Sequence, residues 1–156
     1  MEVKTTSLSS LDTQAIGIII AGFCYKGLVI TLTGDLGAGK TTLVGGIAQG
    51  LGIKEKVTSP TFNILKCYFH KPLDLYHIDA YRLEDGTNKN IGLEEFIEGN
   101  GVCVIEWPDY IKEMIPDEVL NIEIHNLGDD KRELIFRSNI KQLENLLTLI
   151  WSSSNV

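Results

Sequence analysis

The stretch of sequence that decides the fold reads Gly34-Asp35-Leu36-Gly37-Ala38-Gly39-Lys40-Thr41. It has the complete G-x-x-x-x-G-K-S/T spacing of a phosphate-binding loop. The β-branched apolar segment 28–33 precedes it and predicts a buried strand, while the segment 42–51, which Gly52 follows, predicts a helix. Because the motif works only as strand, glycine loop and helix in this order, the context favours nucleotide binding. The alternative is a glycine-rich turn with an exposed lysine.

The residue types in this loop suit phosphate chemistry. Its glycines allow positive φ angles and let the backbone approach an oxygen closely. Backbone N–H groups and the following helix N-terminus would then form a concave anion site. In such a loop Lys40 would reach the β- and γ-phosphates, and the Thr41 hydroxyl would bind Mg²⁺.

Composition sets limits on the class of protein. The chain has 156 residues, 44% apolar and 22% charged, which predicts one domain over residues 1–156. Its net charge of −7 argues against strong unaided binding to nucleic acid. No apolar run approaches the ~18 residues of a membrane span, so a cytoplasmic protein is expected. Three cysteines and three histidines lack metal-ligand spacing, which argues against a zinc or redox role.

The remaining chain alternates strand and helix patterns. Strands are expected at 1–7, 63–69, 73–79, 102–107, 120–125 and 133–137, helices at 10–25, 93–97 and from 139 onward, a polar loop at 88–90, and a frayed tail at 152–156. An apolar face for the first helix is expected from Leu11, Ala15, Ile18, Ile19 and Phe23. This order predicts an α/β fold, the three-layer sandwich of P-loop NTPases, with a mostly parallel sheet and an antiparallel hairpin at one edge.

Two carboxylates, Asp79 and Glu106, each follow an apolar strand. P-loop enzymes place an acid at such a strand end, and ligand sites in open α/β sheets gather at the same edge. One acid could therefore orient the metal while the other positions the attacking water. The alternative for either residue is an ordinary strand-end acid exposed to solvent.

Other signals for a switch and for the base are weaker. Thr61 follows Lys40 by about twenty residues, the interval of a switch threonine that senses the γ-phosphate, and it fits a turn residue equally well. The guanine-reading N-K-x-D pattern is absent, which leaves adenine as the default base. Arginines are scarce, whereas small-molecule kinases clamp two sets of phosphates with several of them.

Four segments, taken together and in order, resemble the TsaE (YjeE) family of bacterial ATPases, which act in the tRNA threonylcarbamoyladenosine pathway. They are the loop 34–42, Ser59-Pro60-Thr61-Phe62, His77-Ile78-Asp79-Ala80-Tyr81-Arg82-Leu83 and Ile105-Glu106-Trp107-Pro108. The stretch 91–96 also resembles the family segment between the last two motifs. The resemblance spans roughly residues 13–132. One departure is the stretch 84–90, where relatives carry a more acidic segment, which puts in doubt any partner contact assigned there.

The resemblance implies ATP hydrolysis that supports a complex modifying the adenosine beside the tRNA anticodon. It implies ATP and Mg²⁺ as ligands, TsaB and TsaD as partners, and tRNA bound indirectly through them. Catalytic roles would fall to Lys40, Asp79 and Glu106, metal binding to Thr41 and Glu106, and the switch to Ser59, Pro60 and Thr61. Nucleotide contacts would fall to Ser10, Leu36, Gly37, Ala38, Gly39, Lys40, Thr41, Thr42, Trp107 and Arg132.

Two competing functions share these features. A small-molecule or nucleoside kinase would use the same loop and acids. A nucleotide-dependent binding module would use hydrolysis only to time association with a partner.

Overall fold

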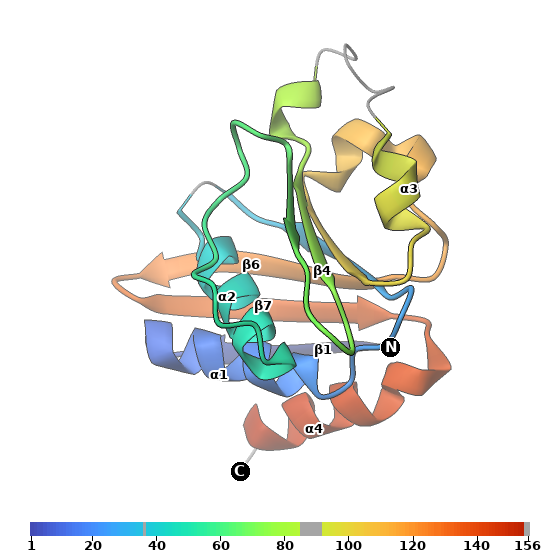
Figure 1. Cartoon of the computed structure of the whole chain (residues 1–156). Helices are drawn as coiled ribbons and strands as arrows, with labels where there is room; N and C mark the ends of the chain where they lie inside the picture. The colour runs from blue at the N-terminus through green and yellow to red at the C-terminus, as the bar shows by residue number, and fades with distance from the viewer. Residues whose placement is uncertain (36, 85–91, 155–156) are drawn as a thin grey trace.

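The structure is a computed structural model that describes residues 1–35, 37–84 and 92–154 (Figure 1). Leu36 and the polar loop expected at 88–90 therefore lie outside the described residues. The elements in chain order are β1 (Glu2–Ser7), α1 (Ser10–Ala21), β2 (Val29–Thr33), α2 (Lys40–Leu51), β3 (Leu65–Tyr68), β4 (Leu75–Asp79), the 3-10 helix η1 (Tyr81–Leu83), α3 (Leu93–Ile97), β5 (Val102–Glu106), η2 (Pro108–Met114), β6 (Leu120–Gly128), β7 (Lys131–Ser138), η3 (Lys141–Leu143) and α4 (Glu144–Ser154). None of the described helices is long and apolar enough to cross a bilayer.

One seven-stranded sheet organises the chain, in the order β1-β7-β6-β2-β5-β4-β3. The four central strands β6, β2, β5 and β4 are parallel, whereas β7, β1 and β3 each pair antiparallel with their neighbours. The expected α/β fold is confirmed, with a mixed sheet whose core is largely parallel. The expected position of the hairpin is wrong, because β6 pairs with β2 and β1 covers β7. Turn chemistry reveals a hairpin, but long-range pairing decides where in the sheet it lies.

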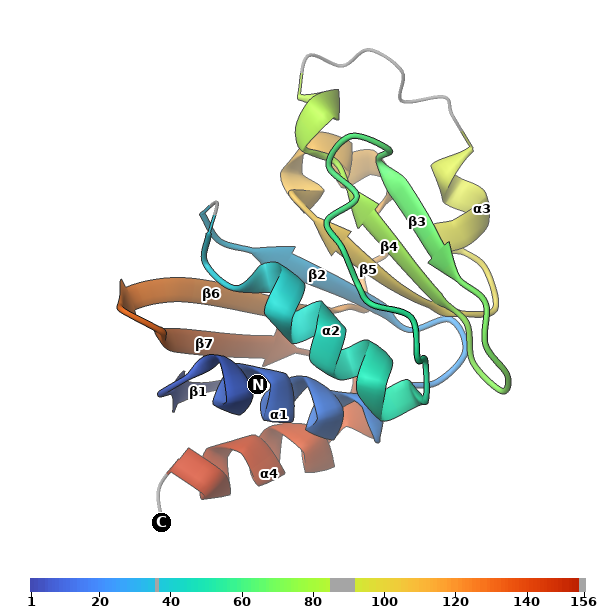
Figure 2. The same cartoon turned by 60° about the vertical axis from the view of Figure 1, so that its left-hand side comes forward.

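The core has two parts, one on each face of the sheet. Neighbouring residues on β5 alternate between them: Val104 joins the cluster under α1, α2 and α4, and Ile105 joins the cluster under α3. This alternation follows from the two-residue period of a strand. Figure 2 shows α1 and α2 side by side on one face, with α3 on the other. Both faces of the central strands are thus buried, which explains their continuous apolar sequences.

The helix α1 differs from its prediction in length and in its buried face. It ends at Ala21 rather than near residue 25, and the Ser9 hydroxyl caps it by accepting a hydrogen bond from the Asp12 amide. Leu11 is 76% exposed, Ala15 and Ile18 also face solvent, and the buried positions are Thr13, Gly17, Ile20 and Ala21. An apolar run of three isoleucines fits more than one helix face, so packing against α2 makes the choice.

Glycines allow that packing to be close. A Cβ on Gly46 of α2 would lie 2.2 Å from the backbone oxygen of Gln14, and one on Gly17 of α1 would lie 2.5 Å from the backbone oxygen of Leu43. Real Cβ atoms do not approach backbone oxygens this closely. The two helix backbones are therefore in contact at a distance that only glycine permits.

We expect Gly46→Ala to destabilise the protein by about 1–3 kcal/mol, the usual cost of overpacking a well-packed core. The matched control is Gly45→Ala, since a Cβ on Gly45 meets nothing within 4 Å. That change should stabilise the helix by about 0.5–1 kcal/mol, because alanine favours helix more than glycine does. Thermal and urea denaturation of the two variants measure the difference, and equal stabilities would contradict the close helix contact.

The ends of the chain and the cysteines complete the fold. β1 forms one edge of the sheet as expected, and α4 continues to Ser154, into the segment expected to be a tail.

Cys103 is buried in β5 and Cys24 is half-buried after α1. Burial raises the pKa of both thiols, that of Cys24 to about 12, so both remain neutral core groups near neutral pH.

Candidate functional site at the glycine loop

The glycine loop, residues 34–39, connects the end of β2 to the start of α2. Gly34 has φ 150° and Gly39 has φ 101°, values that side-chain-bearing residues rarely adopt. A Cβ on Gly34 would also lie 2.5 Å from the backbone oxygen of Ile124 on β6. Glycine is thus required both by the backbone angles and by the neighbouring strand. The loop delivers Lys40 as the first residue of α2.

Lys40 is buried, with only 6% of its surface exposed. Its Nζ donates a hydrogen bond to the Gly34 carbonyl at 2.7 Å, lies 3.7 Å from Glu106 Oε1, and sits 4.5 Å from the centroid of the Trp107 ring. The alternative of an exposed lysine on a glycine-rich turn is therefore wrong. A buried ammonium group held at the mouth of a glycine loop is suited to bind an anion there.

The two strand-end carboxylates lie next to each other. Asp79 and Glu106 are register partners at the ends of the parallel strands β4 and β5, and each is 3% exposed. Parallel strands end at the same edge of a sheet, which is why two acids far apart in sequence meet here. The alternative of solvent-exposed strand-end acids is wrong for both residues.

The segment 59–61 reaches Asp79 from the loop that follows α2. Thr61 Oγ1 donates a hydrogen bond of 2.9 Å to Asp79 Oδ2, and the Ser59 and Thr61 hydroxyl oxygens lie 2.6 Å apart. The second oxygen, Asp79 Oδ1, accepts from the Tyr81 amide at 3.0 Å. Pro60 is buried, and its carbonyl accepts from two backbone amides of the following turn. Thr61 is thus both a turn residue and a contact of a site carboxylate.

Aromatic rings form one wall beside Lys40. Trp107 has a positive φ of 57°, directly after β5, and its ring stacks on Tyr110 at a centroid distance of 6.0 Å with an interplanar angle of 9°. Tyr81 completes the cluster, 5.1 Å from the Trp107 ring. The flat indole face toward Lys40 is an apolar surface on which a cation or a planar group can rest.

Arg132 approaches the glycine loop from β7. Its Nε donates a hydrogen bond to the Ala38 carbonyl at 2.8 Å, and a second guanidinium nitrogen lies 3.4 Å from the Gly37 carbonyl. In the sheet Arg132 is the register partner of Ser7, which places the start of α1 near the same end of the strands. Ser10 is exposed there and does not line the site.

These residues surround one hollow of about 410 Å³. Its lining residues are Gly37, Gly39, Lys40, Thr41, Thr42, Ser59, Thr61, Asp79, Glu106, Trp107 and Arg132. Eleven of the residues predicted for the site thus come together, while Ser10, Ala38 and Pro60 stand behind or outside the lining. A larger hollow of about 730 Å³ is lined by residues of α2 and of the segment 52–57 that follows it, and it shares Thr41 and Thr42 with this one.

The oxygens at the site suit a hard cation. The Thr41 hydroxyl and the carboxylates of Asp79 and Glu106 all border the hollow. Among the described residues, no group of three or more histidine, cysteine or acidic side chains could hold a metal by itself. Mg²⁺ fits such a site, because it prefers oxygen ligands and takes only one or two carboxylates beside waters and phosphates. The donors therefore favour Mg²⁺ carried with a phosphate ligand over an autonomous metal centre.

The motif that contains His77 assigns this residue no role, but the structure places its side chain against a carboxylate of the site. His77 is fully buried in β4, and its Nε2 lies 2.6 Å from Glu106 Oε2. The strand period indicates that His77 lies on the same face of β4 as Asp79, because the two are two residues apart. Metal-ligand spacing within the sequence does not reveal the contact of His77 with Glu106, since this carboxylate comes from a different strand.

Comparison with known proteins shows the family of this chain. A family model, "Threonylcarbamoyl adenosine biosynthesis protein TsaE", matches residues 7–134. A Bacillus subtilis relative named tRNA threonylcarbamoyladenosine biosynthesis protein TsaE is 47% identical over 135 residues, 86% of this chain and 85% of its own. A Treponema pallidum relative of the same name is 41% identical, over 85% of this chain and 98% of its own.

A solved structure agrees in fold. The crystal structure of Bacillus subtilis YdiB superimposes with a TM-score of 0.77 at 38% identity and covers 99% of this chain and 95% of that one. The family model spans the glycine loop, both strand-end carboxylates and Arg132. On this evidence of sequence, fold and site, the chain belongs to the TsaE family.

Proposed function

We propose that this chain is a Mg²⁺-dependent ATPase of the cytoplasm. It would support the complex that forms the threonylcarbamoyl modification on the adenosine next to the anticodon of tRNA. The observation that carries the ATPase proposal is the convergence of Lys40, Asp79 and Glu106 at the mouth of the glycine loop. Membership of the TsaE family supports the role in tRNA modification.

The phosphates would be held by backbone N–H groups of residues 36–42 and by Lys40. In the structure Lys40 is bound to the Gly34 carbonyl and faces Glu106, so phosphate binding requires the ammonium group to exchange these contacts. Thr41 and Glu106 would hold Mg²⁺, which neutralises charge developing on the phosphate oxygens. Asp79, whose oxygens accept from Thr61 and the Tyr81 amide, would orient the attacking water or the metal's water ligands.

The nucleoside would occupy the side of the loop near Arg132 and Trp107. The Arg132 guanidinium lies against the loop carbonyls, and the Trp107 ring borders the same hollow. Ser10 at the start of α1 is proposed as a contact of the adenine. Ser10 does not line the hollow in the structure. The contact therefore requires that the adenine extend beyond the hollow or that the start of α1 move toward it.

The proposed partners are TsaB and TsaD, with tRNA bound through them. The net charge of −7 supports an indirect role in tRNA binding, because an acidic protein repels the phosphate backbone. The hydrolysis step would then act on the assembly rather than on tRNA directly. Ser59, Pro60 and Thr61 are the segment proposed to switch, since Thr61 links the loop after α2 to Asp79.

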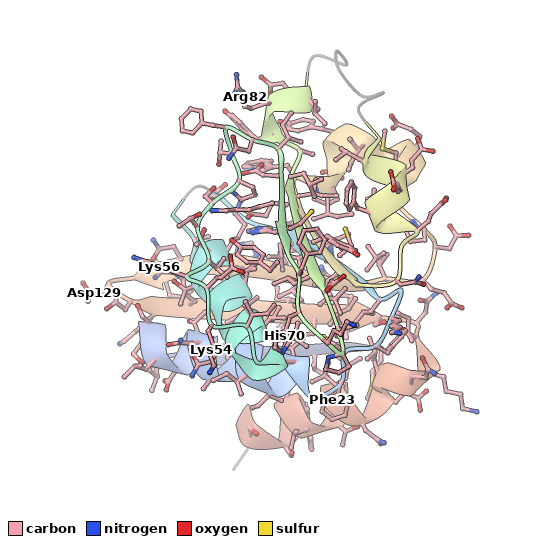
Figure 3. All side chains as sticks on the ribbon, in the orientation of Figure 1. Phe23, Lys54, Lys56, His70, Arg82 and Asp129 are labelled. Carbon is pink, nitrogen blue, oxygen red and sulfur yellow. The ribbon has the colours of Figure 1, made fainter. Side chains whose placement is uncertain are left out.

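A small-molecule kinase is the second candidate, and the arginines argue against it. Arg137 pairs with Glu2 and Glu123, and Arg82 donates to the Phe62 carbonyl beside η1 (Figure 3). Among the described residues, Arg132 is the one arginine that lines the hollow. A kinase that clamps two sets of phosphates generally needs more.

Reconstitution of the modification tests the proposal. Threonine, bicarbonate, ATP and tRNA are incubated with the other proteins of the pathway, including TsaB and TsaD, with and without this chain. We expect modified tRNA to depend on the chain, and its ATP hydrolysis to be weak alone and to rise with TsaB and TsaD. Phosphate transfer to a metabolite at a kinase-like rate would overturn the ATPase assignment. Full modification with a chain that binds but does not hydrolyse ATP would support a binding module instead.

A further inference from the structure

His77 is the buried polar group at the site that the proposed reaction does not use. Its ring is 0% exposed, in the middle of the apolar strand β4. Nε2 lies 2.6 Å from Glu106 Oε2, and Nδ1 is buried with no hydrogen-bond partner among the described residues. The ring thus makes one side-chain hydrogen bond, and it makes it to a carboxylate of the site.

The chemistry of the pair determines the direction of that bond. A carboxylate can only accept hydrogen bonds, so Nε2 carries the hydrogen and donates it to Oε2. Burying the second ring nitrogen without a partner costs desolvation free energy, which an apolar side chain of similar size would avoid. Fold stability therefore does not explain a histidine here, whereas a requirement for the bond to Glu106 does.

The positions in the sheet explain how one ring can orient Glu106. The register partner of Glu106 is Asp79, and that of His77 is Val104, so His77 stands one pleat back along the sheet on the same face. From there it holds Oε2, while Oε1 lies 3.7 Å from Lys40 Nζ. The two oxygens of one carboxylate are thereby given different partners.

We propose that His77 is a positioning residue that holds Glu106 through Nε2–H···Oε2 and leaves Oε1 for the cation at the site. This inference rests on the proposed Mg²⁺-dependent ATPase. Without the bond, the Glu106 side chain can rotate. Metal binding must then fix this side chain, and the free-energy cost of doing so weakens the binding of the metal. His77 does not line the hollow, and its side-chain hydrogen bond goes to Glu106, so its effect passes through Glu106.

A matched pair of variants tests the role, His77→Gln and His77→Met. The two new side chains have nearly the same shape, and only glutamine carries an N–H donor near the place of Nε2. Three quantities are measured for each: the kcat of ATP hydrolysis, the Mg²⁺ concentration for half-maximal rate, and the nucleotide Kd in EDTA by calorimetry. His70→Met, on the β3–β4 turn, serves as a control for loss of a histidine elsewhere (Figure 3).

In His77→Met we expect the Mg²⁺ requirement to rise or the rate to fall by about 10–100-fold, the usual effect of losing a partner of a metal ligand. The nucleotide Kd in EDTA should stay within about 2-fold of wild type, since phosphate contacts to the loop remain. His77→Gln should recover most of the loss, and His70→Met should behave as wild type.

Different failures point to different conclusions. If His77→Met keeps the wild-type Mg²⁺ requirement and rate, or if His77→Gln is as impaired as His77→Met, the positioning role is overturned. Equal weakening of Kd in EDTA and of kcat would also overturn it, because that pattern indicates a general structural defect. If the wild-type chain neither hydrolyses ATP nor binds nucleotide more tightly with Mg²⁺, the proposed function itself fails.

Discussion

The substitution Lys40→Ala is expected to reduce Mg²⁺-dependent ATP hydrolysis by about 100-fold or more, the scale of losing a preorganised group that stabilises transition-state charge. Lys40 is 6% exposed and its ammonium group is held at the mouth of the glycine loop by the Gly34 carbonyl and Glu106. Truncation removes the ammonium group that pairs with Glu106 at the start of α2. The measurement is steady-state phosphate release, together with nucleotide Kd by calorimetry.

A second lysine provides the control for this experiment. Lys54 is exposed on the segment that follows α2 (Figure 3). It lines the larger hollow beside α2 and is absent from the lining of the site. Lys54→Ala should leave hydrolysis unchanged, because a solvated lysine outside the site stabilises no reacting charge. Both variants should unfold cooperatively, since neither residue fills the apolar core. Hydrolysis by Lys40→Ala at the wild-type rate would refute the role of the loop.

The substitution Glu106→Gln should lower Mg²⁺-dependent turnover by about 100-fold, and it should change nucleotide Kd in EDTA by less than about 3-fold. Glutamine keeps the size of the side chain and can still accept the hydrogen bond from His77, so the change removes mainly the negative charge. Binding of Mg²⁺ depends on this negative charge more strongly than binding of the nucleotide does. Turnover measured across a Mg²⁺ titration, with calorimetry in EDTA, separates the two effects.

The surface of the sheet offers a matched control for Glu106. Glu123 on β6 also pairs with a histidine, His125, and hydrogen bonds from Arg137 and then His125 hold the pKa of Glu123 below its usual value. The pair is partly solvated, so Glu123→Gln should cost about 0–1 kcal/mol of stability and no activity. Equal loss of turnover in the two variants, or equal loss of turnover and EDTA binding in Glu106→Gln, would contradict a metal role.

Much of the site could be predicted because its parts are local in sequence. The loop 34–39 specifies its own geometry through glycines, and the helix after it begins at Lys40. The acids Asp79 and Glu106 each end an apolar strand, and parallel strands in an open sheet bring such ends to one edge. The prediction that both carboxylates lie at the loop's edge of the sheet therefore needed only the strand pattern, whereas their direct pairing needed the strand order.

Other features depended on contacts between distant segments and could not be predicted. The buried face of α1 is set by the close approach of Gly17 and Gly46 to the facing backbones, which the run of isoleucines does not encode. The hairpin β6–β7 lies inside the sheet because β1 pairs with its outer strand. His77 lies in one of the quoted motifs, but its contact with Glu106 appears only when β4 and β5 are side by side.

The sequence by itself determined that a strand, a glycine loop and a helix stand in order, and that two acids each end an apolar strand. Those features follow from backbone angles and from a two-residue period, which act over a few residues. Only the tertiary structure decided that Lys40 is buried and which oxygen of Glu106 faces it. Burial and hydrogen bonding between strands depend on the whole sheet, because a side chain is desolvated only when segments distant in sequence close around it.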